Sequence, residues 1–160
     1  MQEQHFDSFN ERLDRFLNDQ TSYDDLHHRR LEPIDVRRKH DLVVTTGMQR
    51  IAKLVTGKTT TSFTHMACGT GTNAESSGDT SLQSETQRIT CTDRFDSGTS
   101  IKFAGLFPSS TPTGQISEFG IFDLASAGNM LVRTVFTPAI GHVQNSTVFA
   151  LTQIIAQSAS

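Results

Sequence analysis

Two apolar runs in the last third of the chain predict a β-hairpin. The runs Ile116–Phe122 and Met130–Phe136 are rich in Ile, Val and Phe, which suit a pleated and packed surface. The connector between them, Ala125–Asn129, is small and polar and contains Gly128, as is typical of a hairpin turn. Pro138 is expected to end the second strand, because proline cannot donate a hydrogen bond to a ladder.

Apolar side chains occupy both faces of this predicted hairpin. Phe119 points to one face of the first strand, whereas Phe122 and Glu118 point to the other. We therefore expect one face to pack against a second sheet and the other against an arm or a neighbouring subunit. Glu118 and Arg133 are the only charged residues of the two runs. A buried carboxylate needs a partner, so we expect an ion pair across the hairpin, with a structural role favoured over a binding role.

Four further strands are predicted between residues 42 and 160. Their apolar runs are separated by Gly-, Pro- and Ser-rich turns and cover Phe63–Cys68, Glu85–Arg94, Ser100–Phe107 and His142 to about Gln157. Together with the hairpin they make six short strands. This pattern predicts a mainly β fold, an antiparallel and jelly-roll-like β-sandwich.

One short helix is predicted to lead into the sandwich. Met48, Ile51, Leu54 and Val55 recur at helical spacing. Thr46 is expected to cap the start of this helix, and Gly57 is expected to close its end.

A second helix is predicted at the N-terminus. An apolar stripe recurs at spacings of three and four residues and consists of Phe6, Phe9, Leu13, Phe16 and Leu17. The run is about three turns long, which is marginal for a helix alone in water. The stripe must therefore be buried on the rest of the chain, on copies of itself or on a partner protein.

The distribution of charge divides the chain. Residues 1–41 hold 10 of the 17 acidic and 7 of the 14 basic residues, which leaves 7 of each in residues 42–160. We therefore expect a charged N-terminal arm over 1–41 and a β-sandwich domain over 42–160. The formal net charge of −3 gives no overall reason to expect nucleic acid as a partner. No apolar run approaches the length of a membrane span, and the first residues lack the features of a signal peptide.

The arm carries two basic clusters, His27–Arg30 and Arg37–His40, interleaved with acidic residues. Mixed charge of this kind is typical of a solvated face or of a strip that docks on another protein. His27 and His28 lack further converging ligands for a metal. The residues expected to form the interface of the arm are Phe6, Phe9, Leu13, Phe16, Leu17, Arg29, Arg30, Arg37 and Arg38.

Four motifs in order give the sequence a resemblance to a known group of proteins. They are VVTxxGxxxIAxLVxG at Val43–Gly57, THxAxGTGT at Thr64–Thr72, xDTxLxxETxR at Gly78–Arg88 and ISEFGIFxxxSxGxMLxRTVFxP at Ile116–Pro138. In this order they resemble a domain of structural proteins of tailed viruses of bacteria and archaea. The resemblance covers about 100 residues and leaves the arm outside.

This resemblance implies a β-sandwich that forms part of a virus particle. It favours a symmetric homo-oligomer in the tail, fibre or baseplate region, made in the host cytoplasm and docked on other virion proteins by its arm. A capsid-surface decoration or turret protein is the alternative. The matched residues expected to hold the structure are Gly69, Gly71, Asp79, Glu85, Arg88, Glu118, Gly120 and Arg133.

Two other classes of protein remain open at this point. An enzyme would need a convergent set such as His65 or His142 with an acid (Asp79, Glu85 or Asp123) and a serine, but no nucleophile elbow or metal-ligand spacing supports one. We therefore expect no catalytic residue, no metal and no cofactor. Asp79 and Glu85 are expected to pair with backbone amides or with Arg88.

A module that binds host glycans is the second of these classes. The loops 73–84 and 108–114 are rich in Ser, Thr and Gly but offer no aromatic platform for a sugar. The two cysteines, Cys68 and Cys91, are expected to be free, small and buried, with a disulfide between strands as the alternative.

Overall fold

The computed structural model describes residues 39–108, 110–112, 114–142 and 148–155, which belong to a compact unit that begins at Arg37. The predicted arm helix and the predicted arm interface, from Phe6 to Arg38, lie outside the described residues. The prediction of a helical arm therefore stays a prediction.

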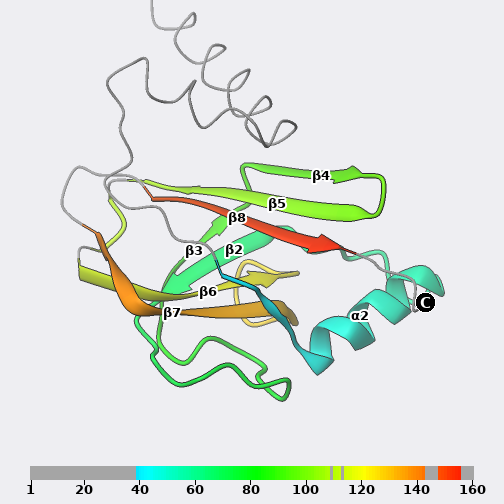
Figure 1. The fold of residues 1–160 in the computed structure, drawn as a ribbon. Helices are drawn as coiled ribbons and strands as arrows, with labels where there is room; N and C mark the ends of the chain where they lie inside the picture. The colour runs from blue at the N-terminus through cyan, green and yellow to red at the C-terminus, as the bar shows by residue number, and fades with distance from the viewer. Residues whose placement is uncertain (1–38, 109, 113, 143–147, 156–160) are drawn as a thin grey trace, which may run out of the picture. The chain divides into compact units, whose positions relative to one another are not determined.

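The described part of the chain is mainly β and antiparallel, as the sequence predicts, with a single described helix (Figure 1). A five-stranded sheet has the order β1-β7-β6-β2-β3, and a three-stranded sheet has the order β4-β5-β8. The elements are β1 Leu42–Val43, α2 Thr45–Val55, β2 His65–Gly69, β3 Glu85–Thr90, β4 Asp93–Ser97, β5 Ser100–Phe107, β6 Gly114–Phe122, β7 Met130–His142 and β8 Val148–Ile155.

The two sheets share one apolar core. Phe103 and Phe107 of β5 belong to the same buried cluster as Phe119 and Ile121 of β6. The rings of Phe107 and Phe119 meet edge to face, with centroids 5.7 Å apart. This contact is the favoured geometry for two aromatic rings and ties one sheet to the other.

The other face of the β6–β7 hairpin is covered by the chain's own loop, residues 70–84, referred to below as the cover loop. Its Leu82 joins Ala67, Phe122 and Met130 in a second buried cluster. The expectation that an arm or a neighbouring subunit would cover this face is wrong for the described hairpin. Consequently, the two-faced pattern no longer argues for an oligomer.

The predicted strand Glu85–Arg94 is two strands, because the chain passes from one sheet to the other. The N–H of Cys91 donates to Thr64 O at 2.8 Å, beside β2, whereas the N–H of Thr92 donates to Ala104 O of β5 at 2.8 Å. Cys91 therefore lies between β3 and β4, not within a strand. An alternating pattern cannot reveal such a crossing, because both halves suit a strand.

The hairpin is confirmed, but Pro138 does not end it. β7 continues to His142, and the register shifts between the pairs Glu118–Val135 and Ile116–Ile140. Pro138 lies in this irregular stretch, where the N–H that it lacks is not needed by the ladder. Of the last predicted strand, His142 belongs to β7 instead, and Val148–Ile155 form β8.

Helix α2 begins one residue before its predicted cap. Val44 is the N-cap, and the Thr46 hydroxyl donates instead to Met130 O at 3.1 Å. Gly57, with φ of 67°, closes the helix as predicted. Ile51 and Leu54 pack on the core, but Met48 and Val55 are 57% and 82% exposed, so only part of the predicted stripe is buried. No helix in the described part is both long and apolar enough to span a membrane.

Candidate functional site

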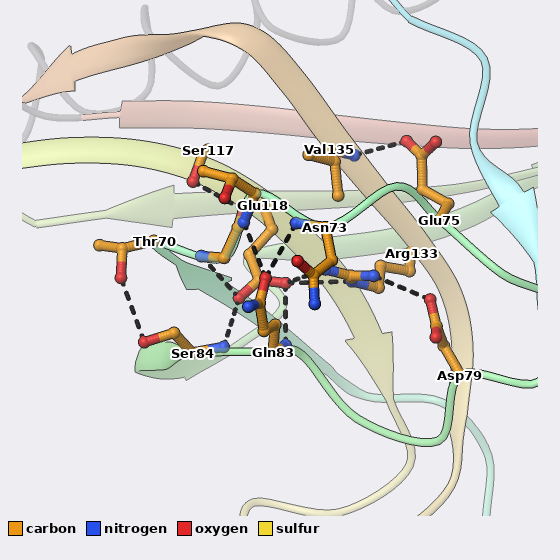
Figure 2. A network of polar contacts seen from close by, with 12 residues as sticks. Thr70, Asn73, Glu75, Asp79, Gln83, Ser84, Ser117, Glu118, Arg133 and Val135 are labelled. Carbon is orange, nitrogen blue, oxygen red and sulfur yellow. Dashed lines mark hydrogen bonds and ion pairs between the residues drawn. The ribbon is translucent and has the colours of Figure 1, made fainter.

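The most concentrated polar site of the described residues surrounds Glu118, a carboxylate with no exposed surface on the covered face of β6. Figure 2 shows how the cover loop wraps around it. Glu118 Oε1 accepts the N–H groups of Gly71 and Ser84 at 3.0 and 2.7 Å, and Oε2 accepts that of Gln83 at 3.0 Å. The carboxylate thus holds both ends of the cover loop.

Arg133 of β7 completes the site and neutralises Glu118. Its Nε and Nη2 donate to Glu118 Oε2 at 3.0 and 2.9 Å, which confirms the predicted ion pair across the hairpin. Its Nη1 donates to Asp79 Oδ2 at 2.8 Å, and the arginine side chain is only 3% exposed. Removing charged groups from water is costly, and the pairing of the guanidinium with two carboxylates compensates this cost.

The electrostatics of Asp79 and Arg133 reflect this pairing. Burial by itself would raise the pKa of Asp79, but hydrogen bonds from the Ser76 amide and from Arg133 outweigh it, and the pKa lies below its ordinary value. Burial would lower the pKa of Arg133, and the hydrogen bonds to Asp79 and Glu118 instead raise it. Both groups stay charged at neutral pH. The sequence predicted an amide or arginine partner for Asp79, but the arginine is Arg133, not Arg88.

Two glycines of the GTGT motif allow this close approach. A Cβ on Gly71 would lie 2.4 Å from Glu118 Oε1, and one on Gly69 would lie 2.3 Å from Ser84 O. A Cβ on Gly120 would lie 3.0 Å from Leu82, so the same sheet surface leaves little room there. Glycine is required at these positions because a Cβ atom would lie too close to neighbouring atoms, and none of the three has a positive φ.

Lys39 and Asp41 fasten the start of the described chain to β7. Glu75 accepts the N–H of Val135 at 2.6 Å and forms an ion pair with Lys39, whose ammonium also donates to Val135 O at 2.6 Å. Asp41 accepts hydrogen bonds from Thr134 of β7 and Thr152 of β8, which belong to different sheets. The distribution of charge placed Lys39 and Asp41 within the predicted arm, because a lone charged residue does not indicate the distant residue with which it will pair.

Opposing factors set the pKa values of these two acids. Burial raises the pKa of Asp41 and outweighs the two threonine hydrogen bonds. Burial also acts to raise the pKa of Glu75, but the hydrogen bonds from Lys39 and the Val135 amide lower it overall. Asp41 is consequently the acid that burial makes costly to ionise.

Arg88 and Glu85, the other predicted structural pair, fix the connector of the hairpin. Arg88 forms an ion pair with Glu85 at 2.6 Å and donates to the carbonyls of Leu124 and Ala127. Its guanidinium carbon lies 3.6 Å from the centre of the Phe122 ring, a cation–π contact.

Asp123 holds the same connector from within. Its carboxylate accepts the backbone and side-chain N–H groups of Asn129 at 2.7 and 2.8 Å. Arg50 of α2 lies 3.1 Å from it as an ion pair, without the alignment of a hydrogen bond.

The groups that could have formed a catalytic triad are engaged separately. His65 Nδ1 lies 2.8 Å from the Thr64 hydroxyl, and His142 Nδ1 lies 3.3 Å from Pro112 O. The three candidate acids, Asp79, Glu85 and Asp123, bind Arg133, Arg88 and Asn129 as described above.

A pocket of about 440 Å³ is lined by residues of the cover loop and by Arg133. Because the Arg133 guanidinium is already bound to two carboxylates, a ligand in this pocket would contact mainly the side chains of the cover loop. No aromatic side chain is among the described residues that line it, which are Asn73, Ala74, Gly78, Asp79, Thr80, Ser81, Leu82, Gln83 and Arg133.

Cys68 and Cys91 are free and buried, as the sequence predicts. Burial raises the pKa of both thiols, that of Cys91 to about 11, so neither is a ready nucleophile. Within the described residues, no group of three or more His, Cys, Asp or Glu side chains could hold a metal ion.

No family model, curated protein or solved structure matches this chain. The geometry of the described residues is therefore what bears on function. It assembles Gly69, Gly71, Asp79, Glu118, Gly120 and Arg133 around the cover loop and places Glu85 with Arg88 at the hairpin connector.

Proposed function

We propose that this chain is a structural protein of a tailed virus particle. It assembles as a symmetric homo-oligomer in the tail, fibre or baseplate region, and its arm, residues 1–41, docks it onto neighbouring virion proteins. The resemblance of the four ordered motifs is the starting point of this proposal.

The observation that carries the proposal is what the motif residues do. Glu118 receives five hydrogen bonds, three of them from backbone amides of the cover loop, and has no exposed surface. Such a carboxylate has no free oxygen with which to bind a substrate or to move a proton. Its effect is to hold a long loop in one position on a sheet, which is the property that a building block needs.

The proposal includes the arrangement of the two sheets as a jelly-roll-like β-sandwich. Two antiparallel sheets that share one core support a β-sandwich. Three neighbouring pairs join consecutive strands (β2–β3, β4–β5 and β6–β7), and three join strands that are distant in the chain (β1–β7, β6–β2 and β5–β8). Long connections of the second kind are compatible with the jelly-roll-like topology of the proposal.

The test of location is an image of the particle whose genome encodes this chain. Gold-labelled antibodies against the purified protein should mark the tail or baseplate region. Labelling over the capsid surface would favour the alternative, a decoration or turret protein. Particles that carry no label, while the protein is abundant in the infected cell, would contradict a virion role.

The test of the arm uses two double variants of the full chain. Burying an apolar side chain contributes about 1.5–3 kcal/mol, whereas a surface ion pair contributes about 0–1 kcal/mol. Phe9→Asp with Phe16→Asp should therefore abolish incorporation into particles, and Arg29→Ala with Arg30→Ala should reduce it less. Equal incorporation of the two variants would show that the apolar stripe is not the anchor.

Binding of host glycans is the competing function. The polar pocket beside the cover loop offers amide and hydroxyl groups, but its described lining lacks an aromatic surface for stacking on a sugar ring. A glycan array probed with the purified protein decides between the two. Specific binding that is lost in Asn73→Ala would favour the glycan-binding module.

A further inference from the structure

Most strand edges of the described sheets carry features that discourage pairing with another chain. The outer edge of β7 is blocked at Val135, whose N–H and C=O are bound by Glu75 and Lys39. The edge strand β3 carries Glu85 and Arg88. The edge strand β4 has only five residues and contains three charges, Asp93, Arg94 and Asp96. Charged and short edges are the usual protection against edge-to-edge association.

Strand β8 is the exception. It forms an edge of the three-stranded sheet, where it pairs along its full length with β5 (Figure 1). Among the described residues, no strand pairs with its other side. Val148–Ile155 contains no charged residue, and no Lys, Arg, Asp or Glu follows Arg133 in the sequence. A long, uncharged edge of this kind is a template for strand pairing.

The register identifies which backbone groups of β8 face outward. Ala104 O accepts the N–H of Thr92, so the backbone polar groups of Ala104 point toward β4. Those of its neighbours Phe103 and Gly105 must then point toward β8, because successive residues alternate. Thr152 and Ala150 pair with Phe103 and Gly105, so the backbone N–H and C=O groups of Thr152 and Ala150 point toward β5. The N–H and C=O groups of Leu151 and Gln153 therefore point to the open edge.

We propose that the β8 edge pairs antiparallel with the β8 edge of a second copy of this chain. An isologous contact places each residue opposite one from the same segment, so a charged segment would oppose like charges. β8 avoids this in every register, since it has no charge to repel. The Leu151 side chain, 38% exposed, lies on the outer face of the sheet and would gain an apolar neighbour there. A two-fold pairing joins the two three-stranded sheets into one continuous sheet.

This inference deepens the proposed function, on whose homo-oligomer it rests, by naming the interface. It is tested by amide hydrogen exchange of the full chain, followed by NMR at several concentrations, with light scattering on the same samples. The Leu151 and Gln153 amides should exchange at least about tenfold more slowly at high than at low micromolar concentration. The Ala150 and Thr152 amides, which are bonded to β5, should stay slow throughout and report that β8 remains folded.

A charged variant tests whether the edge itself forms the contact. Leu151→Lys with Gln153→Lys places cations on the edge of both copies and should return the protein to monomer, with fast exchange at both outward amides. Thr60→Lys with Thr90→Lys is the matched control, because both threonines are exposed, lie outside β8 and bring the same change in charge. The control should keep the oligomer.

Three results would overturn the inference, and they bear differently on the proposed function. Protection of both outward amides at every concentration would mean that the chain's own segment covers the edge. An oligomer that survives the charged variant would place the interface elsewhere and leave the proposed homo-oligomer intact. A wild-type protein that stays monomeric at all concentrations would contradict both the β8 interface and the homo-oligomer, while the labelling of particles still tests the virion role.

Discussion

Replacing Glu118 by glutamine isolates the contribution of the buried carboxylate. Glu118→Gln keeps the volume of the side chain but removes the charge that neutralises Arg133, whose side chain is 3% exposed. One end of the new amide must also turn its NH₂ group toward donors, since both oxygens of Glu118 accept at least two hydrogen bonds. Both effects destabilise the folded protein.

The magnitude follows from the cost of a buried charge that loses its partner. Removing one partner of a buried ion pair costs about 3–5 kcal/mol. Proteins are stable by only about 5–15 kcal/mol, so this is a large fraction of the total. At roughly 2–4 °C per kcal/mol, the melting temperature should fall by about 10 °C. Scanning calorimetry measures this fall, and amide exchange should show the Gly71, Gln83 and Ser84 amides losing protection.

Glu85→Gln is the matched control for this change. Glu85 also forms an ion pair with an arginine of the same sheet, but its side chain is 31% exposed. Water can replace the lost contact there, so we expect a cost of about 0–1 kcal/mol. Equal losses of stability in the two variants would refute the reasoning, because burial would then not decide the energetics.

Two further predictions concern packing and protonation. Gly71→Ala should cost about 1–3 kcal/mol, since its Cβ would lie 2.4 Å from Glu118 Oε1, whereas Gly78→Ala, with its nearest contact at 3.8 Å, should leave the melting temperature almost unchanged. A raised pKa means that folded Asp41 binds its proton more tightly than unfolded Asp41, so its ionisation destabilises the protein as pH rises above the unfolded value. Asp41→Asn should therefore raise the free energy of unfolding at pH 7 but not at pH 3, and urea denaturation that showed a loss at pH 7 would contradict the role of burial.

Local patterns predicted the hairpin, most strand positions and the pair formed by Glu118 and Arg133. These predictions succeeded because strand runs, turn residues and an isolated pair of opposite charges are local signals, readable from residues close in sequence. Gly57 succeeded for the same reason, since a helix end needs a residue that tolerates positive φ.

Contacts between distant segments could not be predicted in the same way. The cover loop is polar along most of its length, so nothing in its composition showed that Leu82 would be buried beside Phe122. The crossing at Cys91 and the irregular register around Pro138 depend on which sheet accepts each backbone group. These choices are made by tertiary packing and leave no periodic trace in the sequence.

The way in which the cover loop is held bears on the proposed role of a repeated building block. Apolar contacts such as those of Leu82 are non-directional and tolerate several loop positions. Hydrogen bonds from Gly71, Gln83 and Ser84 to one buried carboxylate are satisfied together in a single arrangement. Any other position of the loop removes these amide donors from Glu118 and leaves the ion pair with Arg133 incompletely hydrogen-bonded. Identical copies in a symmetric assembly must present the same surface to each other. A loop fixed by a buried charge meets that requirement at a cost in desolvation that a flexible binding loop would not need.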